Sequence, residues 1–316
     1  MKIGLLPVSV VPLLISSVHA FTVESHHYHA GRRATQCRRV LPVGTSRKSV
    51  GQPSEATATS DAQSGLYRPF LDYAWKKIEH AGILLPSDGS LVPSDLAVNT
   101  AIAKGMPEGT VVKVSVDAKL GNAPVQYGRY ALLETLLPEE KDTNIKGIQV
   151  LNLVIFGTPP LPVWGVDLVS LPGNRHLLAM DVQPMVASTA TTNDEKWKAW
   201  HDTHVRDTFE WGGDLPEAAR KFFSPNALWT RLSGENAVET IQTTVFAAFC
   251  AHLDLYLECV ASSCPDTPVS ENHQAEYLAY RLANDPARPM LQSLYGPEWT
   301  ERVLEEVLFN KDRALP

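Results

Sequence analysis

The middle of the chain carries short apolar segments that are separated by turn-forming residues. Glycine, proline and asparagine interrupt the apolar residues at 121–122, at 138, at 157–160 and at 172–174. Short segments rich in Val, Ile, Leu and aromatic residues are typical of β-strands, and strands with no helix between them pair antiparallel. The pattern predicts five strands of an antiparallel meander, at 111–116, 125–136, 148–156, 163–170 and 176–182.

Apolar residues recur at helical spacing on both sides of this region. A first helix is predicted over 65–82, with Gly82 as its C-terminal stop, and a connection rich in Pro, Ser and Gly follows to about residue 108. From Asn193 onward the pattern predicts helices only. They are expected at about 194–211, 216–223, 235–262, 271–284 and 298–309.

This order of elements predicts the fold class. One helix, then five closely spaced strands, then a helical half indicate an α+β fold, a three-layer α/β/α sandwich with a central antiparallel β-sheet flanked by helices on both faces. No internal repeat and no second domain boundary occur, so residues 65–316 are predicted to form a single domain.

Composition narrows the class of protein. The chain has 316 residues, of which 44% are apolar and 20% charged, as is typical of globular proteins. No run of 18 apolar residues occurs, so we expect no membrane span. A formal net charge of −7 argues against binding of nucleic acid, which needs a basic surface. The charge is uneven, however, because residues 1–64 carry seven basic and three acidic side chains, which leaves 21 and 32 for the rest.

The basic first part of the chain has the pattern of a targeting leader. Residues 1–20 combine Lys2, an apolar run and a small-residue cleavage pattern at Val18 and Ala20, and predict a signal peptide. Residues 21–64 begin with Phe21 and are rich in Ser, Thr, His and Arg, as transit peptides are. Together they resemble the bipartite leaders of algae with secondary plastids, which implies import into the plastid stroma (chloroplast). The alternative is a secreted protein with a basic linker.

The sequence lacks the common cofactor and metal motifs. Neither GxGxxG nor GxxxxGK[ST] occurs, so no standard dinucleotide or nucleotide phosphate site is predicted. His201 and His204 lie on one predicted helical face, but no carboxylate or cysteine pattern flanks them, so we interpret them as an exposed polar face and predict no metal site. Cys250, Cys259 and Cys264 form no CxxC pair and are predicted to be reduced packing residues.

Asp167 is the only charge in the apolar segment 161–171. On a strand it shares a face with Gly165 and Val169, while Trp164 and Val166 point the other way. If helices cover both faces, Asp167 is partly buried, and burial raises the pKa of a carboxyl so that it can hold and deliver a proton near neutral pH. The alternative is an acid at an uncovered part of the sheet or one paired with an arginine.

Asp285 is a second acid in an unusual place. It ends a predicted helix directly before Pro286, which disfavours helical geometry for it, and Arg281 lies one turn earlier. A helix-end residue paired with Arg281 or Arg288 is the simpler interpretation, and a proton donor at a turn is the functional one.

Several ordered blocks of the sequence are similar to one enzyme family. The segments 147–156, 161–173, 176–184, 222–231, 280–288 and 295–309 resemble the ferredoxin-dependent bilin reductases. The likeness extends over about 66–309. It implies an α/β/α sandwich that holds an open-chain tetrapyrrole (bilin) between the sheet and the C-terminal helices, with no bound flavin, nicotinamide or metal and with electrons from reduced [2Fe-2S] ferredoxin.

The resemblance also implies roles for single residues. Asp167 corresponds to a first proton donor and Asp285 to a second. Asn152 stands where some members carry a catalytic histidine, and it could hydrogen-bond the bilin without titrating. The two propionates of the substrate need cationic or hydroxyl partners, for which Arg175, Arg231, Arg281 and Arg288 are candidates.

The reaction within the family is left with alternatives. The blocks 223–232 and 253–258 look closest to the branch that reduces the A-ring diene of 15,16-dihydrobiliverdin to phycoerythrobilin. The alternative is the partner reaction, biliverdin to 15,16-dihydrobiliverdin, whose enzyme could pass on its product to this chain. A non-catalytic bilin carrier or chaperone is a hypothesis of another class, against which the two acids argue.

An acidic ferredoxin would be repelled by an acidic domain unless the basic residues are gathered in one place. We therefore expect a local basic patch. Its candidate members are Lys104, Lys113 and Lys119 on one side, or Arg206, Arg220 and Lys221 on the other.

Overall fold

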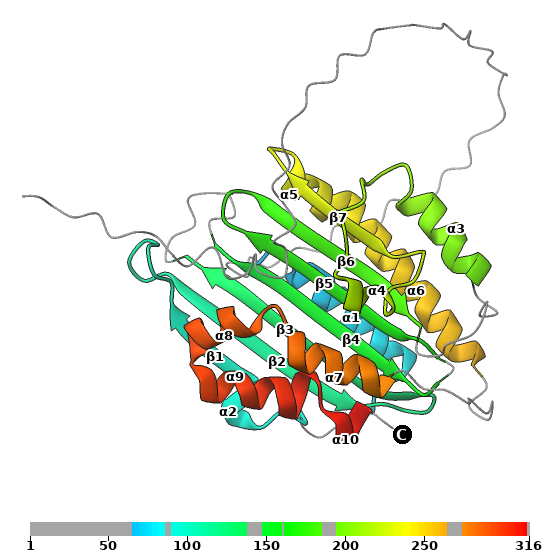
Figure 1. Ribbon diagram of the computed structural model, residues 1–316, viewed down its shortest axis with the longest axis horizontal. Coiled ribbons are helices and arrows are strands. Elements are labelled where there is room, and N and C mark those ends of the chain that lie inside the picture. The colour runs from blue at the N-terminus through cyan, green and yellow to red at the C-terminus, as the bar shows by residue number, and fades with distance from the viewer. Residues whose placement is uncertain are drawn as a thin grey trace, which may run out of the picture.

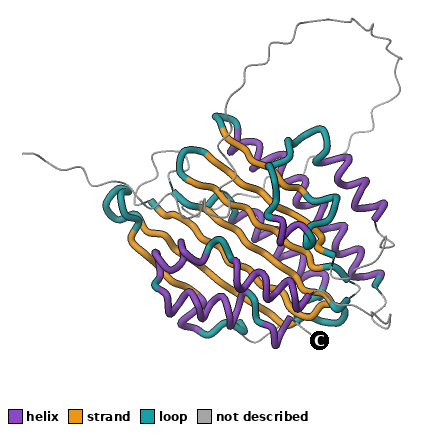
Figure 2. The backbone as a smooth tube through the Cα atoms, in the orientation of Figure 1, coloured by secondary structure: helices purple, strands orange, loops and turns teal. Residues whose placement is uncertain are grey.

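The computed structural model describes residues 65–85, 90–137, 147–159, 161–184, 194–263 and 274–314. The predicted leader, its cleavage pattern and Cys264 lie outside these residues, so the predictions made for them stay predictions. The described residues form an α+β fold of three layers, in which helices lie on both faces of one β-sheet (Figures 1 and 2).

The sheet has seven strands in the order of the chain, and every neighbouring pair is antiparallel. This meander confirms the predicted sheet class, and all five predicted strands are present within a few residues of their predicted ends. The strands are β1 Val98–Ile102, β2 Val111–Leu120, β3 Val125–Leu136, β4 Gln149–Gly157, β5 Val163–Leu171, β6 Arg175–Gln183 and β7 Leu228–Ser233.

The two outer strands were not predicted, and the expectation that the chain is entirely helical after residue 193 is wrong. Strand β7 lies inside the helical half, has only six residues, and alternates buried Leu228 and Thr230 with half-buried Trp229 and Arg231. Strand β1 is an edge strand of five residues in which even Val98 and Ile102 are exposed, so its two faces show no contrast between apolar and polar side chains. Both strands form because the sheet offers an unpaired edge, which a local pattern does not reveal.

Helices α1 Arg68–Ala81, α3 Asp194–His204 and α6 Phe246–Ser262 cover one face, here called the back face. Phe70 of α1 packs edge-on against Phe249 of α6, with ring centroids 5.1 Å apart, and Trp164 of β5 donates a hydrogen bond of 2.8 Å to His252 of α6. Helix α1 ends at Gly82, whose φ of 64° is left-handed, as its predicted role as a stop requires. Helix α3 is shorter than predicted and ends at His204.

Helix α6 continues α5 Ala237–Thr240 and η1 Ile241–Val245, a π-helical stretch, into one run over Ala237–Ser262. This run is long and apolar enough to cross a membrane by length and composition alone, and the core helix of a folded domain passes the same test. Its buried side chains pack against α1 and the back face of the sheet, which accounts for its apolar character. Cys250 and Cys259 on this run are free thiols, half-buried and buried.

The C-terminal helices cover part of the opposite face, here called the front face. Figure 1 shows α7 Gln274–Asn284, α8 Arg288–Tyr295 and α9 Pro297–Val303 in front of strands β1 to β4. Helix α8 was not predicted, and the predicted helix 298–309 is α9 followed by η2 Leu304–Leu308. Three short helices complete the fold: α2 Ser94–Ala97, α4 Glu217–Arg220 and α10 Lys311–Ala314.

Within the part of the chain that the structure describes, no long helix lies in front of β5 to β7 (Figure 1). Cross-strand partners share a face, so the register places Ala179 and Trp229 in one row with Asp167, and Leu177 and Arg231 in the next row. These four neighbours of Asp167 are half-buried rather than buried. The front face is therefore closed over β1 to β4 and more open toward β7.

Candidate active site

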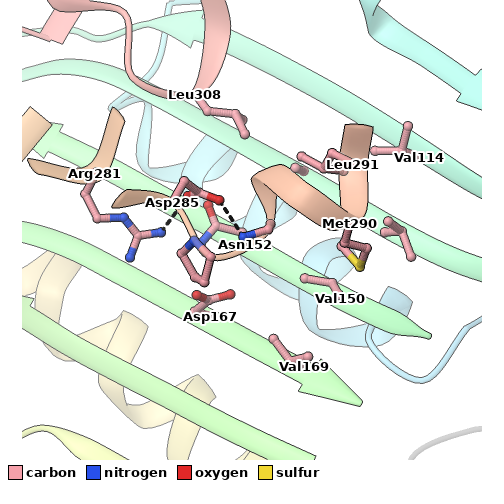
Figure 3. Close-up of a pocket in the computed structure, with 14 residues that line it drawn as sticks. Val114, Val150, Asn152, Asp167, Val169, Arg281, Asp285, Met290, Leu291 and Leu308 are labelled. Atoms are coloured by element: carbon pink, nitrogen blue, oxygen red, sulfur yellow. Dashed lines mark hydrogen bonds and ion pairs between the residues drawn. The ribbon is translucent and has the colours of Figure 1, made fainter. Parts of the chain in front are cut away.

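A pocket lies on the front face where the C-terminal helices meet the middle of the sheet (Figure 3). The space between its walls, counted together with its open mouth, is about 670 Å³. Its walls are mostly apolar and its few polar groups are Asn152, Asp167, Arg281 and Asp285. The other lining residues are Val114, Ala131, Leu133, Val150, Val169, Pro286, Ala287, Met290, Leu291 and Leu308.

The floor of the pocket is polar because two neighbouring strands place polar side chains opposite each other. Asn152 of β4 and Asp167 of β5 are direct partners in the antiparallel register, and both point to the front face. The predicted alternation along β5 is confirmed, since Trp164, Val166 and Leu168 are buried in the core behind the sheet. Asp167 is half-buried and faces the pocket, in agreement with its predicted partial burial.

Asp285 enters the same pocket from the opposite wall. It follows α7, and its carboxylate accepts a hydrogen bond of 2.8 Å from the backbone N–H of Ala287 and forms an ion pair of 3.2 Å with Arg281. The predicted pairing with Arg281 is therefore present. Figure 3 shows Asp285 above the sheet and Asp167 on it, so two acids that are 118 positions apart in sequence line one cavity.

The environment shifts the acid–base properties of these groups. Burial raises the pKa of Asp167 above its ordinary value, while the positive charge of Arg281 and a hydrogen bond from Asn152 act in the opposite direction and Asp285 adds to the increase. Burial opposes the charge of Arg281, but nearby Tyr277, Asp285 and Asp167 together raise its pKa. Arg281 thus stays a cation between two carboxyl groups, and burial favours the protonated form of Asp167.

One charged residue next to the pocket was missed by the sequence analysis. Arg129 of β3 is fully buried on the front face, where its guanidinium hydrogen-bonds the side-chain oxygen of Asn152 and the carbonyl of Leu308. The available signal was the one used for Asp167, a single cation inside an apolar strand.

The other predicted substrate-binding residues are spread out. Arg231 lies half-buried on the open part of the front face, two strands from Asp167. Arg175 is exposed at the start of β6 and donates a hydrogen bond of 3.2 Å to the carbonyl of Pro172. Arg288 pairs with Glu301 of α9 and bonds the carbonyl of Leu282. Of the four arginines named from the sequence, only Arg281 lines the pocket.

Metal-ligating side chains are not grouped in the described part of the chain. Among the described residues no group of three or more His, Cys, Asp or Glu could hold a metal ion. His201 and His204 are half-buried near the end of α3, where His201 approaches Asp202 at 3.8 Å.

Comparisons with known proteins point to one family. Residues 143–310 match the family model described as ferredoxin-dependent bilin reductase. The chain is 36% identical over 268 residues to a phycoerythrobilin:ferredoxin oxidoreductase of Nostoc punctiforme, covering 79% of this chain and 95% of that protein. It is 42% identical over 180 residues to the protein of the same name from Gloeobacter violaceus, covering 52% of this chain and 70% of that one.

A solved structure supports the fold independently. The crystal structure of phytochromobilin synthase from tomato in complex with biliverdin superimposes with a TM-score of 0.58, over 77% of this chain and 83% of that one. The sequences are 21% identical, so this likeness concerns the fold.

Proposed function

The chain belongs to the ferredoxin-dependent bilin reductase family and is an oxidoreductase, and from this premise we propose that it reduces the A-ring diene of 15,16-dihydrobiliverdin to give phycoerythrobilin. The observation that carries the proposal is the pocket that joins Asp167, Asp285 and Asn152 over the sheet. The choice of reaction is supported by relatives named phycoerythrobilin:ferredoxin oxidoreductase. The match to one of them covers 95% of that relative's length and 79% of this chain.

The reaction adds two electrons and two protons to the bilin. Ferredoxin carries one electron at a time, so two reduced ferredoxins are consumed and the bilin passes through a radical. We assign the first proton to Asp167, because burial keeps this carboxyl protonated at a higher pH than an exposed one. We assign the second proton to Asp285, which lies across the same pocket.

The other polar groups of the pocket bind and orient the substrate. Asn152 does not titrate and can hydrogen-bond the lactam or pyrrole groups of the bilin. Arg281 and Arg231 are the arginines of the front face that are best placed for the propionates, the first in the pocket and the second on the open part of the sheet. We propose that no cofactor is bound and that electrons pass from ferredoxin to the bilin directly.

Ferredoxin docks, in this proposal, on the front side near the open part of the sheet. Arg220 and Lys221 are exposed on and after α4, and the next residue, Phe222, packs against Tyr277 of α7 at 5.4 Å between ring centroids. Lys113 and Lys119 of the alternative patch alternate with buried front-face residues on β2, so they point to the back face, where Lys119 pairs with Glu79 of α1. The observations therefore favour Arg220 and Lys221 of the second predicted patch, whereas its third member, Arg206, follows α3 of the back face and pairs with Asp202.

The test is an anaerobic assay with reduced ferredoxin, in which biliverdin and 15,16-dihydrobiliverdin are supplied separately and the products are separated by chromatography. We expect dihydrobiliverdin to be converted to phycoerythrobilin. Conversion of biliverdin to dihydrobiliverdin without further reduction would favour the partner reaction instead. A bound bilin whose absorbance never changes under reducing conditions would indicate a carrier.

We also propose that residues 1–64 direct the chain to the plastid, where reduced ferredoxin is available, and that a preceding bilin reductase hands over the substrate. A fusion of residues 1–64 to a fluorescent protein should accumulate in the plastid. Secretion of the fusion would contradict this localisation.

A further inference from the structure

Arg129 is a buried cation for which the proposed reaction has no use. Its relative exposure is 0%, and its guanidinium lies 5.6 Å from the centre of the Phe309 ring. The Nε–H group donates a hydrogen bond of 3.1 Å to the carbonyl of Leu308, and Nη1 donates to the side-chain oxygen of Asn152. No carboxylate of the described residues forms an ion pair with it, and Nη2 has no partner among them. Burying a charge in this way is costly, so a role for it is to be sought.

The hydrogen bond to Asn152 fixes which way the amide points. An arginine side chain has only donors, so the atom of Asn152 that faces Arg129 must be the oxygen Oδ1. The NH₂ group then points away from Arg129, and the cross-strand partner on that side is Asp167. We propose that Arg129 is a positioning residue that holds the Asn152 amide with its NH₂ group toward Asp167 and the pocket.

Two effects on Asp167 follow from this arrangement. The hydrogen bond from Asn152 and the positive charge of Arg129 both favour the carboxylate and so oppose the increase of the Asp167 pKa that burial causes. The other groups that face Asp167 are Arg281 and Asp285 from the end of α7 and the Tyr67 hydroxyl from behind the sheet. Arg129 itself stays charged at neutral pH, because burial lowers its pKa only to about 10.

A purely structural role for Arg129 would have a different consequence. If Arg129 only connects β3 to the C-terminal segment through Leu308 and Phe309, its loss would lower stability and leave the titration of Asp167 unchanged. If it positions Asn152, its loss lets the amide rotate and removes a nearby positive charge. The titration of Asp167 therefore separates the two roles.

The experiment follows the Asp167 carboxyl directly in the substrate-free protein. Aspartate is labelled with ¹³C at the side-chain carboxyl, and the Asp167 signal is assigned by its absence in Asp167→Asn. We expect Arg129→Met to raise the midpoint of this signal by about one pH unit, the lower end of what a nearby opposite charge contributes. Arg129→Lys, which keeps the charge, should shift it less, and Arg302→Met, which removes an arginine bonded to Asp95 and Glu306, should not shift it.

A double-variant cycle tests whether the effect passes through Asn152. Asn152→Ala alone should also raise the midpoint, and the combined Arg129→Met and Asn152→Ala variant should shift it by less than the sum of the two. A folded Arg129→Met protein with the wild-type midpoint would overturn the proposal, and so would fully additive shifts.

If Arg129→Met does not fold, a measurement on the wild-type protein still tests the proposed orientation of Asn152. The ¹⁵N-labelled NH₂ signals of Asn152, assigned by their absence in Asn152→Ala, should shift with the midpoint of Asp167, because the group points at that carboxyl. NH₂ signals that ignore the titration of Asp167 would contradict the orientation. The consequence for proton delivery rests on the proposed function, but these measurements need no turnover, so failure of the reductase assay and failure of this inference are distinguishable.

Discussion

Replacement of Asp167 by asparagine removes the proton of the carboxyl and changes little else in the pocket. The amide has nearly the volume of the carboxyl and keeps an oxygen that can accept from Asn152, so the pocket should retain its shape. Asp285 and Arg281 remain as an ion pair of 3.2 Å. The variant therefore separates proton delivery from binding of the substrate.

The expected magnitude follows from the task of the residue. A positioned general acid contributes about 10²- to 10⁴-fold to a rate, which corresponds to roughly 3 to 5 kcal/mol of activation free energy. We expect Asp167→Asn to lower kcat by a factor in this range. The dissociation constant for the bilin should change by less than about tenfold, since one neutral hydrogen-bonding group replaces another. Because the first electron still arrives, an unprotonated bilin radical should accumulate.

The assay combines single-turnover absorbance with electron paramagnetic resonance under anaerobic conditions. The matched control is Asp254→Asn, because Asp254 lies on α6 behind the sheet, has a side chain 45% exposed, and bonds Tyr73 and Lys77. The control should turn over at the wild-type rate. If Asp167→Asn also turned over at that rate with no lasting radical, Asp167 would not be the first donor, and the argument from its burial would fail.

Three further predictions test other parts of the molecule. Burial raises the pKa of Asp181 to about 6, so the contribution of its protonated form to stability is present at low pH and is lost as the pH rises from about 4 through about 6. Over that window, urea unfolding should show the free energy of unfolding of Asp181→Asn increasing by up to about 3 kcal/mol relative to wild type. A Cβ at Gly165 would meet only Gln183 at 3.8 Å, so Gly165→Val should fold with little change in Tm, but its side chain would project beside Asp167 and weaken bilin binding at least tenfold by fluorescence titration. Arg220→Glu should raise the KM for ferredoxin severalfold at low ionic strength and much less at high salt; a KM independent of salt in both proteins would contradict docking near α4.

The central strands and the long helices could be predicted because their patterns are local. Strands β3 and β5 are buried on at least one face along most of their length. Every second side chain of a strand points to the same face, so this burial leaves a visible pattern of apolar residues. Strands β1 and β7 depend instead on a partner far away in the sequence or on an edge that a strand can join. Helix α8 was missed because it has eight residues, of which only Leu291 is buried, too few for a periodic stripe.

The residues of the candidate site likewise include some that a local sequence pattern predicts and some that it does not. Asp167 could be singled out because a single acid in an apolar strand is unusual in any fold, and Asp285 because a proline follows it at the end of a helix. Asp167 and Asp285 line one pocket because of how the C-terminal helices cross the sheet. The spacing of residues in the sequence does not predict this arrangement. Arg129 carried the same local signal as Asp167, but its partner Asn152 lies on the neighbouring strand, so its role becomes visible only through the register.

The division of the front face into a covered and an open part suits the proposed chemistry. Beside the helix-covered part of the sheet, Asp167 of β5 lies half-buried on the floor of the pocket, and this burial raises the pKa of its carboxyl. Toward β7 the sheet is more open, and Arg231 lies two strands across and two residues along from Asp167, about 12 Å away, so part of an extended bilin can reach solvent there. The proposed direct transfer of electrons from ferredoxin to the bilin needs both conditions at once, because the proton is assigned to a half-buried acid while the electrons come from a protein that approaches from outside. The acidic balance of residues 65–316 then matters less than the position of Arg220 and Lys221, which lie on the side from which that approach is possible.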